Sequence, residues 1–359
     1  MKSFNEVFED KTKYGTKIKT SEYCEMGAHL IIDQGQEQVA GYTDIEEGVF
    51  EEVPVIIFGD HTRVIKYVDK PFFLGADGVK VLRSKFKNAN YKYLYYALKN
   101  ARIPNTGYNR HFKWLKEVQI EYPDYRRQEN VVKILDKVSD LIETRQHEIK
   151  RLDDLIKARF VEMFGDININ DKNWNCEPLG ELCTIVRGGS PRPIEQFLGG
   201  DVPWIKIGDA TDGDNIYLNS TKEHIIQEGV KKSRLVKPGS LIFANCGVSL
   251  GFARIITFEG CIHDGWLAME DIDERLDRVF LLQALNQMTE YFRTIAPAGT
   301  QPNLNTAIMK AYMQVIPPIE LQRDYIRFVH QVDKSKVAVQ KALDETQTLF
   351  DSLMQEYFG

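Results

Sequence analysis

Residues 122–165 read YPDYRRQENVVKILDKVSDLIETRQHEIKRLDDLIKARFVEMFG, and residues 316–359 read IPPIELQRDYIRFVHQVDKSKVAVQKALDETQTLFDSLMQEYFG. The two stretches align without a gap, so that a proline, a glutamine and a closing Phe-Gly fall at the same places. Their identity is low, but their apolar periodicity agrees. A long repeated segment of this kind indicates a fold in which one unit occurs twice.

Apolar residues in both copies recur at spacings of three and four, which is typical of helices that pack along a coiled-coil seam. The seam is interrupted at Arg145, Lys336 and Thr346, and Gly165 follows the first helix as a left-handed C-cap would. Antiparallel pairing of the two copies is the simplest way to bury both seams, although helices of another chain would also serve. The residues that we expect to pair are Leu135, Val138, Ile142 and Ile156 in the first helix and Val329, Val332, Leu343 and Phe350 in the second.

The sequence before each helix is also repeated. VIIFGDH at 55–61 resembles SLIFANC at 240–246, and GADGVKVL at 75–82 resembles IHDGWLAM at 262–269. Because short β-type runs alternate with helix-like runs in both parts, we predict an α/β (α+β) fold in which each long helix follows a globular mixed α/β domain. The predicted boundaries are 1–122 for the first domain, 123–165 for its helix, 166–316 for the second domain and 317–359 for its helix.

The two globular parts differ at their starts. Residues 174–192 read WNCEPLGELCTIVRGGSPR, whereas the first domain starts later, with KTKYGTKIKTSEY at 11–23. We find no counterpart of the longer stretch in the first domain, so its loops are not inferred from those of the second.

Composition excludes several classes of protein. Apolar residues make up 43% and charged residues 27% of the chain, which is typical of a globular protein. No apolar run reaches the roughly 18 residues of a membrane helix. The five cysteines contain no CxxC pair, so we expect neither disulfides nor zinc, and we place the chain in the cytoplasm.

Charge is distributed unevenly. The net charge is −6, but residues 53–116 contain 13 Lys or Arg against 3 Asp or Glu. A basic region in an acidic chain is a candidate phosphate-binding face, although an ordinary solvated surface would have the same composition.

The predicted helices have a length of roughly 54 Å. Paired antiparallel, they would hold the two globular domains apart, so that each domain could read one half of a divided DNA site.

Motifs of DNA-modifying enzymes are missing from the sequence. We find no P-loop, no HExxH and no [ND]PP[YF], for which IPPIE at 316–320 is the nearest string. A DNA-binding protein is therefore favoured over an enzyme. A coiled-coil scaffold without a nucleic-acid role is a third alternative, and the basic region argues against it.

The chain resembles the specificity subunit of a Type I restriction–modification enzyme over essentially its whole length. The resemblance rests on the paired helices and on IDQGQEQVAGYTD, VIIFGDHT, GADGVKVL, VRGGSPR, VPWIKIGD, VKPGSLIFANCG and AGTQPNLN. It implies a non-catalytic subunit that binds double-stranded DNA with a bipartite target and has no cofactor of its own. It also implies two methyltransferase subunits that use S-adenosylmethionine, and restriction subunits that use ATP and Mg²⁺, as partners. A recognition subunit of a related DNA-modification system would look the same.

Candidate DNA-binding residues are cationic, amide, aromatic or small polar side chains in loops and turns, together with the backbone N–H groups of the glycine-rich loop at Gly188 and Gly189, which could reach phosphate. For each of them a plain turn, a helix cap or a solvated surface is the alternative, and we expect Asp77 and Asp264 to be turn residues. A His61–Asp60 catalytic pair is disfavoured because no nucleophile lies nearby in sequence. The candidates in the first domain are Lys13, Lys17, Lys19, Tyr23, Gln34, Gln36, His61, Thr62, Thr106, Tyr108, Asn109 and Arg110. Those in the second domain are Arg187, Gly188, Gly189, Ser190, Arg192, Lys206, Asn245, Thr300, Gln301 and Asn303.

Overall fold

Two long helices, α4 (Tyr125–Phe164) and α10 (Ile319–Phe358), occupy the two repeated stretches of sequence. The glutamine of each repeat is buried and turns back to the proline that precedes its helix. The Nε2 of Gln128 donates to the Pro123 carbonyl at 2.8 Å, and Gln322 makes the same bond one repeat later. Gly165 ends α4 with a φ of +77°, which confirms the predicted left-handed C-cap.

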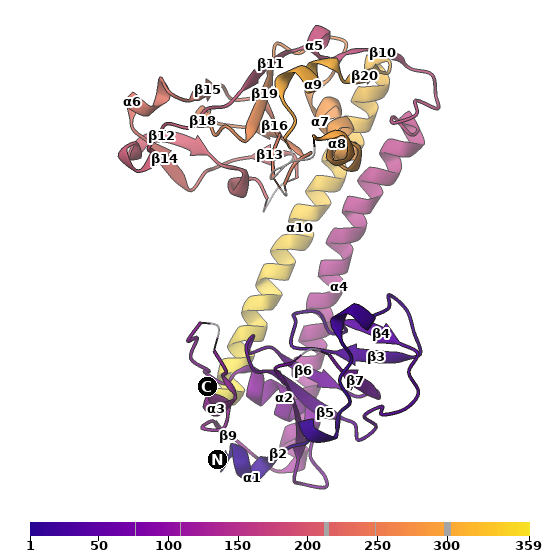
Figure 1. Ribbon diagram of the computed structural model, residues 1–359, viewed down its shortest axis with the longest axis vertical. Coiled ribbons are helices and arrows are strands. Elements are labelled where there is room, and N and C mark those ends of the chain that lie inside the picture. Colours follow the sequence, from indigo (N-terminus) through magenta and orange to yellow (C-terminus); the bar gives the residue numbers. More distant parts are fainter. Residues whose placement is uncertain (76, 108, 212–214, 248, 298–302) are drawn as a thin grey trace. The chain divides into compact units, whose positions relative to one another are not determined.

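The computed structural model describes residues 1–75, 77–107, 109–211, 215–247, 249–297 and 303–359. The predicted site residues Tyr108, Thr300 and Gln301 lie outside the described residues. The chain divides into two units: unit 1 comprises residues 1–147 and 339–359, and unit 2 comprises residues 148–338. Each unit contains one globular region and part of both long helices (Figure 1). In the described part of the chain, no helix is both long and apolar enough to span a membrane.

In unit 1 the beginning of α4 packs against the end of α10. Leu135 and Val138 share a buried core with Phe350 and Met354. The interruption of the seam at Arg145 is a polar contact, because its guanidinium donates to the Ala342 carbonyl at 2.6 Å. Thr346, the second interruption, is also buried and bonds the same carbonyl at 2.7 Å. Ile142 and Leu343 are half-buried.

In unit 2 the end of α4 packs against the beginning of α10. Ile156 belongs to the same core as Val329 and Val332, and the Tyr325 hydroxyl donates to the Ile156 carbonyl at 3.3 Å. Lys336 is the third interruption of the seam, and its ammonium lies 2.5 Å from the Asp153 carboxylate. Both units therefore show the predicted antiparallel pairing of this chain's own helices.

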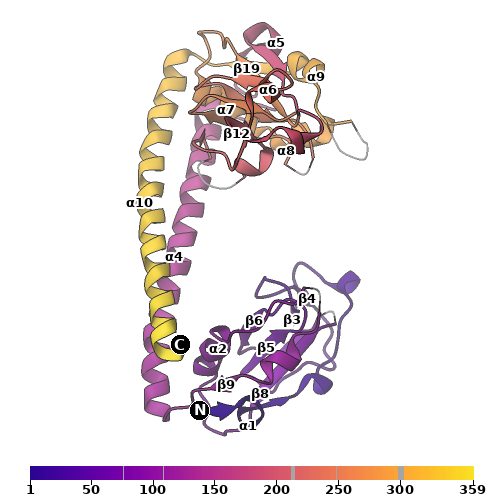
Figure 2. The ribbon, with the colours of Figure 1, turned by 90° about the vertical axis from the view of Figure 1, so that its left-hand side faces the viewer.

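The globular region of unit 1 has two larger sheets, in the orders β2-β8-β5-β6 and β4-β3-β7, besides the strand pair β1-β9. The central strand β5 (Val55–Gly59) is buried along its whole length. Ile56 and Phe58 pack with α2 (Tyr91–Lys99) and the long helices, while Val55 and Ile57 pack with the second sheet. Figure 2 shows α2 between the long helices and the sheets of this unit. The other elements are β1 (Lys2–Ser3), α1 (Phe4–Val7), β2 (Phe8–Asp10), η1 (Thr12–Tyr14), η2 (Thr20–Glu22), β3 (His29–Ile32), β4 (Gly41–Thr43), β6 (Ile65–Val68), β7 (Phe72–Leu74), β8 (Val79–Ser84), α3 (Phe112–Leu115) and β9 (Gln119–Ile120).

Unit 2 repeats this plan with additional strands. Its larger sheets have the orders β11-β19-β16-β17-β13 and β14-β12-β18-β15, besides the strand pair β10-β20, and the central strand β16 (Leu241–Ala244) is again fully buried. Side-chain caps start the corresponding helices, since Asn90 accepts from the Tyr93 N–H before α2 and Asp277 accepts from the Val279 N–H before α7. The elements are β10 (Asn175–Pro178), α5 (Leu179–Leu182), β11 (Thr184–Arg187), η3 (Ile194–Gln196), β12 (Leu198–Ile205), η4 (Ile207–Asp209), β13 (Tyr217–Leu218), β14 (Glu223–Ile225), α6 (Gln227–Val230), β15 (Arg234–Val236), β17 (Ala253–Ile256), β18 (Gly260–Ile262), β19 (Trp266–Glu270), α7 (Arg278–Gln287), α8 (Thr289–Ile295), α9 (Thr306–Ala311) and β20 (Met313–Ile316).

The start of unit 1 does have a counterpart in unit 2, so the expectation that it lacks one is wrong. The order β1-α1-β2 in unit 1 matches β10-α5-β11 in unit 2, and β1 pairs with β9 as β10 pairs with β20. One backbone bond is conserved as well: the Phe4 N–H donates to the Val118 carbonyl at 3.1 Å, and the Leu179 N–H donates to the Tyr312 carbonyl at 2.8 Å. These elements have only two to four residues each, too few to show a periodicity in the sequence.

Candidate nucleic-acid interface

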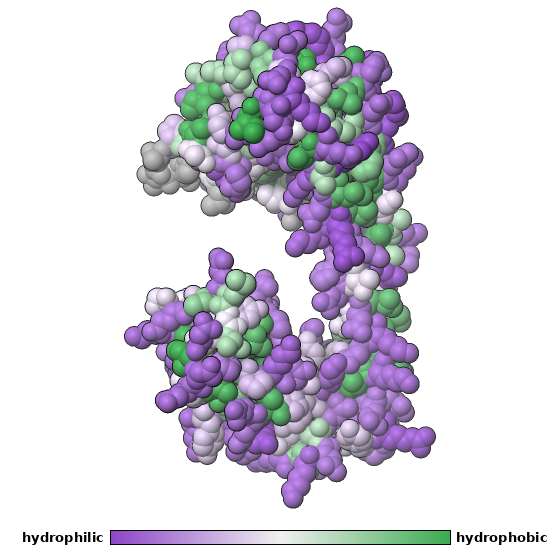
Figure 3. Space-filling view, turned by 90° about the vertical axis from the view of Figure 1, so that its right-hand side faces the viewer, coloured by the Kyte–Doolittle hydropathy of each residue, from purple (hydrophilic) through white to green (hydrophobic). Residues whose placement is uncertain are grey.

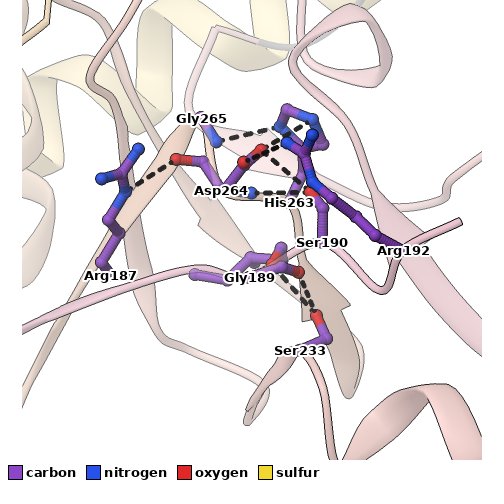
Figure 4. Close-up of polar contacts among 9 residues, drawn as sticks. Arg187, Gly189, Ser190, Arg192, Ser233, His263, Asp264 and Gly265 are labelled. Atoms are coloured by element: carbon purple, nitrogen blue, oxygen red, sulfur yellow. Dashed lines mark hydrogen bonds and ion pairs between the residues drawn. The ribbon is translucent and has the colours of Figure 1, made fainter. Parts of the chain in front are cut away.

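In unit 2 three loops meet at one edge of the main sheet. Strand β16 ends at Ala244 next to the start of β19, and the Asn245 N–H donates to the Gly265 carbonyl at 3.0 Å. On the other side of β19, strand β11 ends at Arg187. The loops that begin at Gly188, Asn245 and His263 therefore lie together. Figure 4 shows the first and third of these loops converging on Asp264.

The carboxylate of Asp264 organises the loop that carries the two arginines. The Ser190 hydroxyl donates to one of its oxygens at 2.9 Å, and the Arg192 guanidinium lies 3.3 Å from the other. The Nε of Arg187 donates to the backbone carbonyl of Asp264 at 3.2 Å (Figure 4). Arg187 and Arg192 are both exposed, and Arg192 is 80% accessible. The site thus exposes two guanidinium groups on a loop that Asp264 holds in place.

The two glycines of this loop have a different role from the predicted one. The Gly188 N–H donates to the Trp266 carbonyl at 2.9 Å, and the Gly189 N–H donates to the Ile262 carbonyl at 3.0 Å. These N–H groups are therefore already bonded and do not face a phosphate. A Cβ at Gly188 would clash with the backbone of His263, so glycine is required for close approach.

The charge of the site depends on His263 and Asp264, whose side chains lie 2.9 Å apart. Burial lowers the pKa of His263 below its ordinary value. Burial alone would raise the pKa of Asp264, but the Ser190 hydroxyl, His263 and Arg192 together hold that pKa below its usual range. At neutral pH the aspartate is therefore ionised and the histidine neutral, so the arginines supply the positive charge.

The remaining candidates of unit 2 lie next to this cluster. Lys206 pairs with Glu223, and its ammonium is 5.9 Å from the centroid of the Trp204 ring, which itself lies 5.7 Å from the His263 ring. Asn245 is fully buried, and its Nδ2 donates to Asn303 at 3.2 Å. Asn245 thus holds the Asn303 segment in place, and direct contact of either residue with DNA stays a prediction.

Unit 1 has the same backbone arrangement at the equivalent edge of its main sheet. In this arrangement, which we call the corner, the residue after the central strand bonds to the glycine before the neighbouring strand. The Asp60 N–H donates to the Gly78 carbonyl at 2.7 Å, as Asn245 does to Gly265 in unit 2. The His111 N–H then donates to the Asp60 carbonyl at 2.8 Å, which matches a bond of the same length from Leu304 to Asn245. Asp77 in unit 1 consequently corresponds to Asp264 in unit 2.

Several predicted residues of unit 1 gather around Asp77. The Lys17 ammonium lies 2.5 Å from the Asp77 carboxylate and, with help from Arg110, lowers the pKa of Asp77. The Nε2 of Gln34 donates to the Asp77 carbonyl at 2.9 Å, and its Oε1 accepts from the His61 N–H at 3.1 Å. Both ends of the Gln34 amide are therefore occupied by backbone groups.

Other predicted residues of unit 1 are arranged differently. The Thr62 hydroxyl donates to the Gln34 carbonyl at 2.6 Å, so Thr62 joins the same corner. Thr106 lies 3.3 Å from the His111 ring, and Asn109 donates to the Thr106 carbonyl, so this loop is closed on itself. No side-chain bond among the described residues brings Lys13, Lys19 or Gln36 to the corner. Tyr23 packs against the small core of Ile18, Ile31 and Phe73.

Sequence reasoning treated Asp77 and Asp264 as turn residues and missed their role as anchors for the basic loops. The signal was available, because Asp-Gly stands before a buried strand in both halves of the sequence. Within the described residues, no group of three or more His, Cys, Asp or Glu side chains is arranged to hold a metal ion.

Comparison with protein families matches both halves of the chain. The family described as "Type I restriction modification DNA specificity domain" matches residues 1–153 and again residues 171–346, which together make up most of the chain. The two matched segments correspond to the two repeats of the fold.

Two curated relatives have related sequences. The specificity subunit of the Type I restriction enzyme EcoR124I/EcoR124II from Escherichia coli is 26% identical over 251 residues, which cover 63% of this chain and 58% of the relative. The specificity subunit of the Type I restriction enzyme MjaIX from Methanocaldococcus jannaschii is 23% identical over 47% of this chain and 40% of the relative. The matched region therefore spans about half the length of these relatives.

Two solved structures share the fold. The S subunit of a Type I restriction-modification system from M. genitalium has a TM-score of 0.59 at 18% identity and covers 100% of this chain and 95% of that one. A chain from a study of complex assembly and conformational transition of the type I R-M system has a TM-score of 0.58 at 17% identity, covering 99% of this chain and 95% of that one.

Proposed function

We propose a function from one premise: the chain belongs to the family of the Type I restriction modification DNA specificity domain. The chain is a DNA-recognition component in which each globular domain reads one half of a bipartite, asymmetric target. The observation that supports this most strongly is the corner that both units share. The same backbone bonds bring a basic loop to the same sheet edge in each unit, while the side chains around it differ.

Different side chains on one scaffold are expected of two readers with different half-sites. Exposed arginines such as Arg187 and Arg192 suit guanine edges and phosphates, and glutamine amides suit adenine. The linking helices α4 and α10 would set the spacer between the half-sites. We assign no catalytic residue to this chain.

The helix pair also offers docking places for partners. Large apolar side chains remain exposed on the helices of each unit, and Figure 3 shows green patches interrupting the polar surface there. Exposed apolar groups on a helix pair favour a protein partner over solvent. These side chains are Ile134, Leu141 and Leu349 in unit 1 and Leu155, Val161 and Val337 in unit 2. We propose that these two sets, which share only the matching pair Leu155 and Leu349 of the two repeats, bind two methyltransferase subunits, to which restriction subunits are added in the cytoplasm.

Catalysis would then belong to the partners. Methyltransferase subunits of this kind transfer the methyl group of S-adenosylmethionine to N6 of adenine, and restriction subunits use ATP and Mg²⁺. The specificity chain would contribute only the choice of DNA sequence.

Genome-wide mapping of N6-methyladenine in the host, with and without this gene, tests the proposal. We expect a split motif of two short sequences with a fixed gap, and we expect its methylation to disappear on deletion of the gene. A methylome that does not change on deletion, in a host whose neighbouring methyltransferase genes are expressed, would contradict the proposal.

A further inference from the structure

Unit 1 contains a buried lysine in its main sheet. Lys66 on β6 has 2% of its side chain accessible, and its ammonium donates to the Glu37 carbonyl at 2.6 Å and lies 3.4 Å from the Asp33 carboxylate. Burial lowers the pKa of Lys66, and Asp33 opposes that shift. A buried ammonium is unfavourable unless it is paired and hydrogen-bonded. The burial of Lys66 therefore indicates that it fixes the position of the segment that contains Asp33 and Glu37.

The groups that Lys66 binds bracket a short turn. Asp33 and Glu37 stand on either side of Gln34-Gly35-Gln36. The Asp33 carboxylate also accepts from the Gly35 N–H at 2.8 Å, which closes the turn from within. A further bond fixes its far side, because the Gln38 amide donates to the Tyr67 carbonyl at 2.7 Å. Strand β6 thus holds the turn at three points.

The side chains of the two glutamines in the turn differ in their hydrogen bonding. The amide of Gln34 is bonded at both ends to backbone groups of the corner. Gln36 is exposed and has no side-chain hydrogen bond to any residue that the structure describes. It borders a groove of about 500 Å³ whose lining includes Arg63 and Lys99. An exposed amide at the border of a groove that two cations also line is suited to a base edge flanked by phosphates.

Unit 2 has a buried cation at the same register position. Lys66 lies opposite Ile57 of the central strand β5, and Arg254 lies opposite Ile242 of the equivalent strand β16. Arg254 is 8% accessible and donates to Asn215 at 3.4 Å. Both repeats therefore use one strand position to anchor a segment outside the sheet, although the segments differ.

We propose that Lys66 is a positioning residue that fixes the Gln34–Gln36 turn, and that Gln36 is the side chain of this turn that determines base specificity in the half-site read by unit 1. This inference rests on the proposed function. It adds a named reader and the buried group that orients it. Adenine is the base expected at that position, because a glutamine amide pairs with its N6 and N7.

The test is selection of bound sequences from randomised duplex DNA by the full-length chain. The variants are Gln36→Ala, Lys66→Met, Lys66→Arg and, as a matched control, Lys70→Met, which removes an exposed lysine from the segment after β6. Arg187→Ala identifies the half-site read by unit 2, so the other half-site belongs to unit 1. Thermal unfolding of each variant shows whether unit 1 is still folded.

We expect Gln36→Ala to abolish the preference at one or two positions of the unit 1 half-site and to weaken binding of the parental duplex roughly tenfold. Lys66→Met should relax the same positions, Lys66→Arg should restore part of the preference, and Lys70→Met should change nothing. Should Lys66→Met unfold the unit, Gln36→Ala and Lys66→Arg still decide the matter.

Two results would overturn the inference while leaving the proposed function intact. One is an unchanged motif and affinity for Gln36→Ala. The other is a Lys66→Met protein that stays folded and binds all sequences more weakly without relaxing any position. A wild-type chain that selects no sequence at all would overturn the proposed function, and this inference with it.

Discussion

The two recognition units differ least where they are buried and most where they meet solvent. Central strand β5 lies between β8 and β6, and central strand β16 lies between the equivalent strands β19 and β17. Phe4 and Leu179 make equivalent backbone bonds although the sequences around them differ. At the sheet edge, however, the Asp77 carboxylate pairs with an exposed lysine in the described part of the chain, whereas the Asp264 carboxylate is held by a serine, an arginine and a histidine. Packing therefore preserves the scaffold in both units, while the edge loops differ, and the proposed function assigns the reading of two different half-sites to these loops.

The largest effects are expected in the helix seam, where the two units share one design. Leu135 is fully buried in the core of unit 1, and Ile156 is buried in the core of unit 2. We expect Leu135→Asp and Ile156→Asp each to destabilise mainly its own unit, by about 4 kcal/mol or more, because each places an unpaired charge in an apolar core.

Hydrogen exchange measured separately over residues 1–122 and 175–316 checks this prediction. Val337→Asp is the control, since Val337 is 70% exposed and should tolerate the charge. Unaltered protection in both units of the Leu135 and Ile156 variants would show that the seam does not stabilise the unit in which each residue lies.

The next effect separates the two units by function. Arg187→Ala and Arg192→Ala remove guanidinium groups only from unit 2, and Lys17→Ala removes an ammonium only from unit 1. We expect each arginine variant to weaken specific DNA binding by about 1–3 kcal/mol, with partner subunits still bound. Binding titrations at several salt concentrations, together with co-purification of the partners, measure both properties. Loss of the partners with retained DNA affinity would reverse the assigned roles.

The corner aspartates should differ in their importance for stability. Asp264→Asn weakens contacts to Ser190, Arg192 and His263 in a half-buried site, and we expect a loss of about 1 kcal/mol after allowance for solvent screening. Asp77→Asn should leave stability unchanged, because the Asp77–Lys17 pair is exposed. Denaturant unfolding of both variants tests the contrast, and equal losses would contradict it.

The smallest effect is a pH dependence confined to unit 2. The folded-state pKa of His263 is lowered by burial, so the folded protein binds this proton less readily than the unfolded chain does. The stability due to neutral His263 is therefore complete above the unfolded value of about 6.5 and declines as the pH falls from there through the folded pKa. Melting temperatures at pH 7 and pH 5.5 should fall less for His263→Gln than for the wild type. An identical fall in both proteins would mean that His263 does not contribute.

The helices and the repeat could be predicted from the sequence because a 3–4 periodicity over 40 residues is a strong local signal. The start of unit 1 could not, since β1, α1 and β2 are too short to have a period and Phe4 stands where unit 2 has Leu179. At the site, the arginine loop was recognisable from its composition. The bonded amide of Gln34 and the burial of Lys66 depend on residues distant in sequence, which no local pattern contains.

Footprinting of the full chain on its selected duplex tests the central claim most directly. We expect two protected patches separated by an unprotected spacer, and we expect Arg187→Ala to weaken one patch and Lys17→Ala to weaken the other. A single continuous footprint, or the same patch weakened by both variants, would contradict the claim that each unit reads its own half of the target.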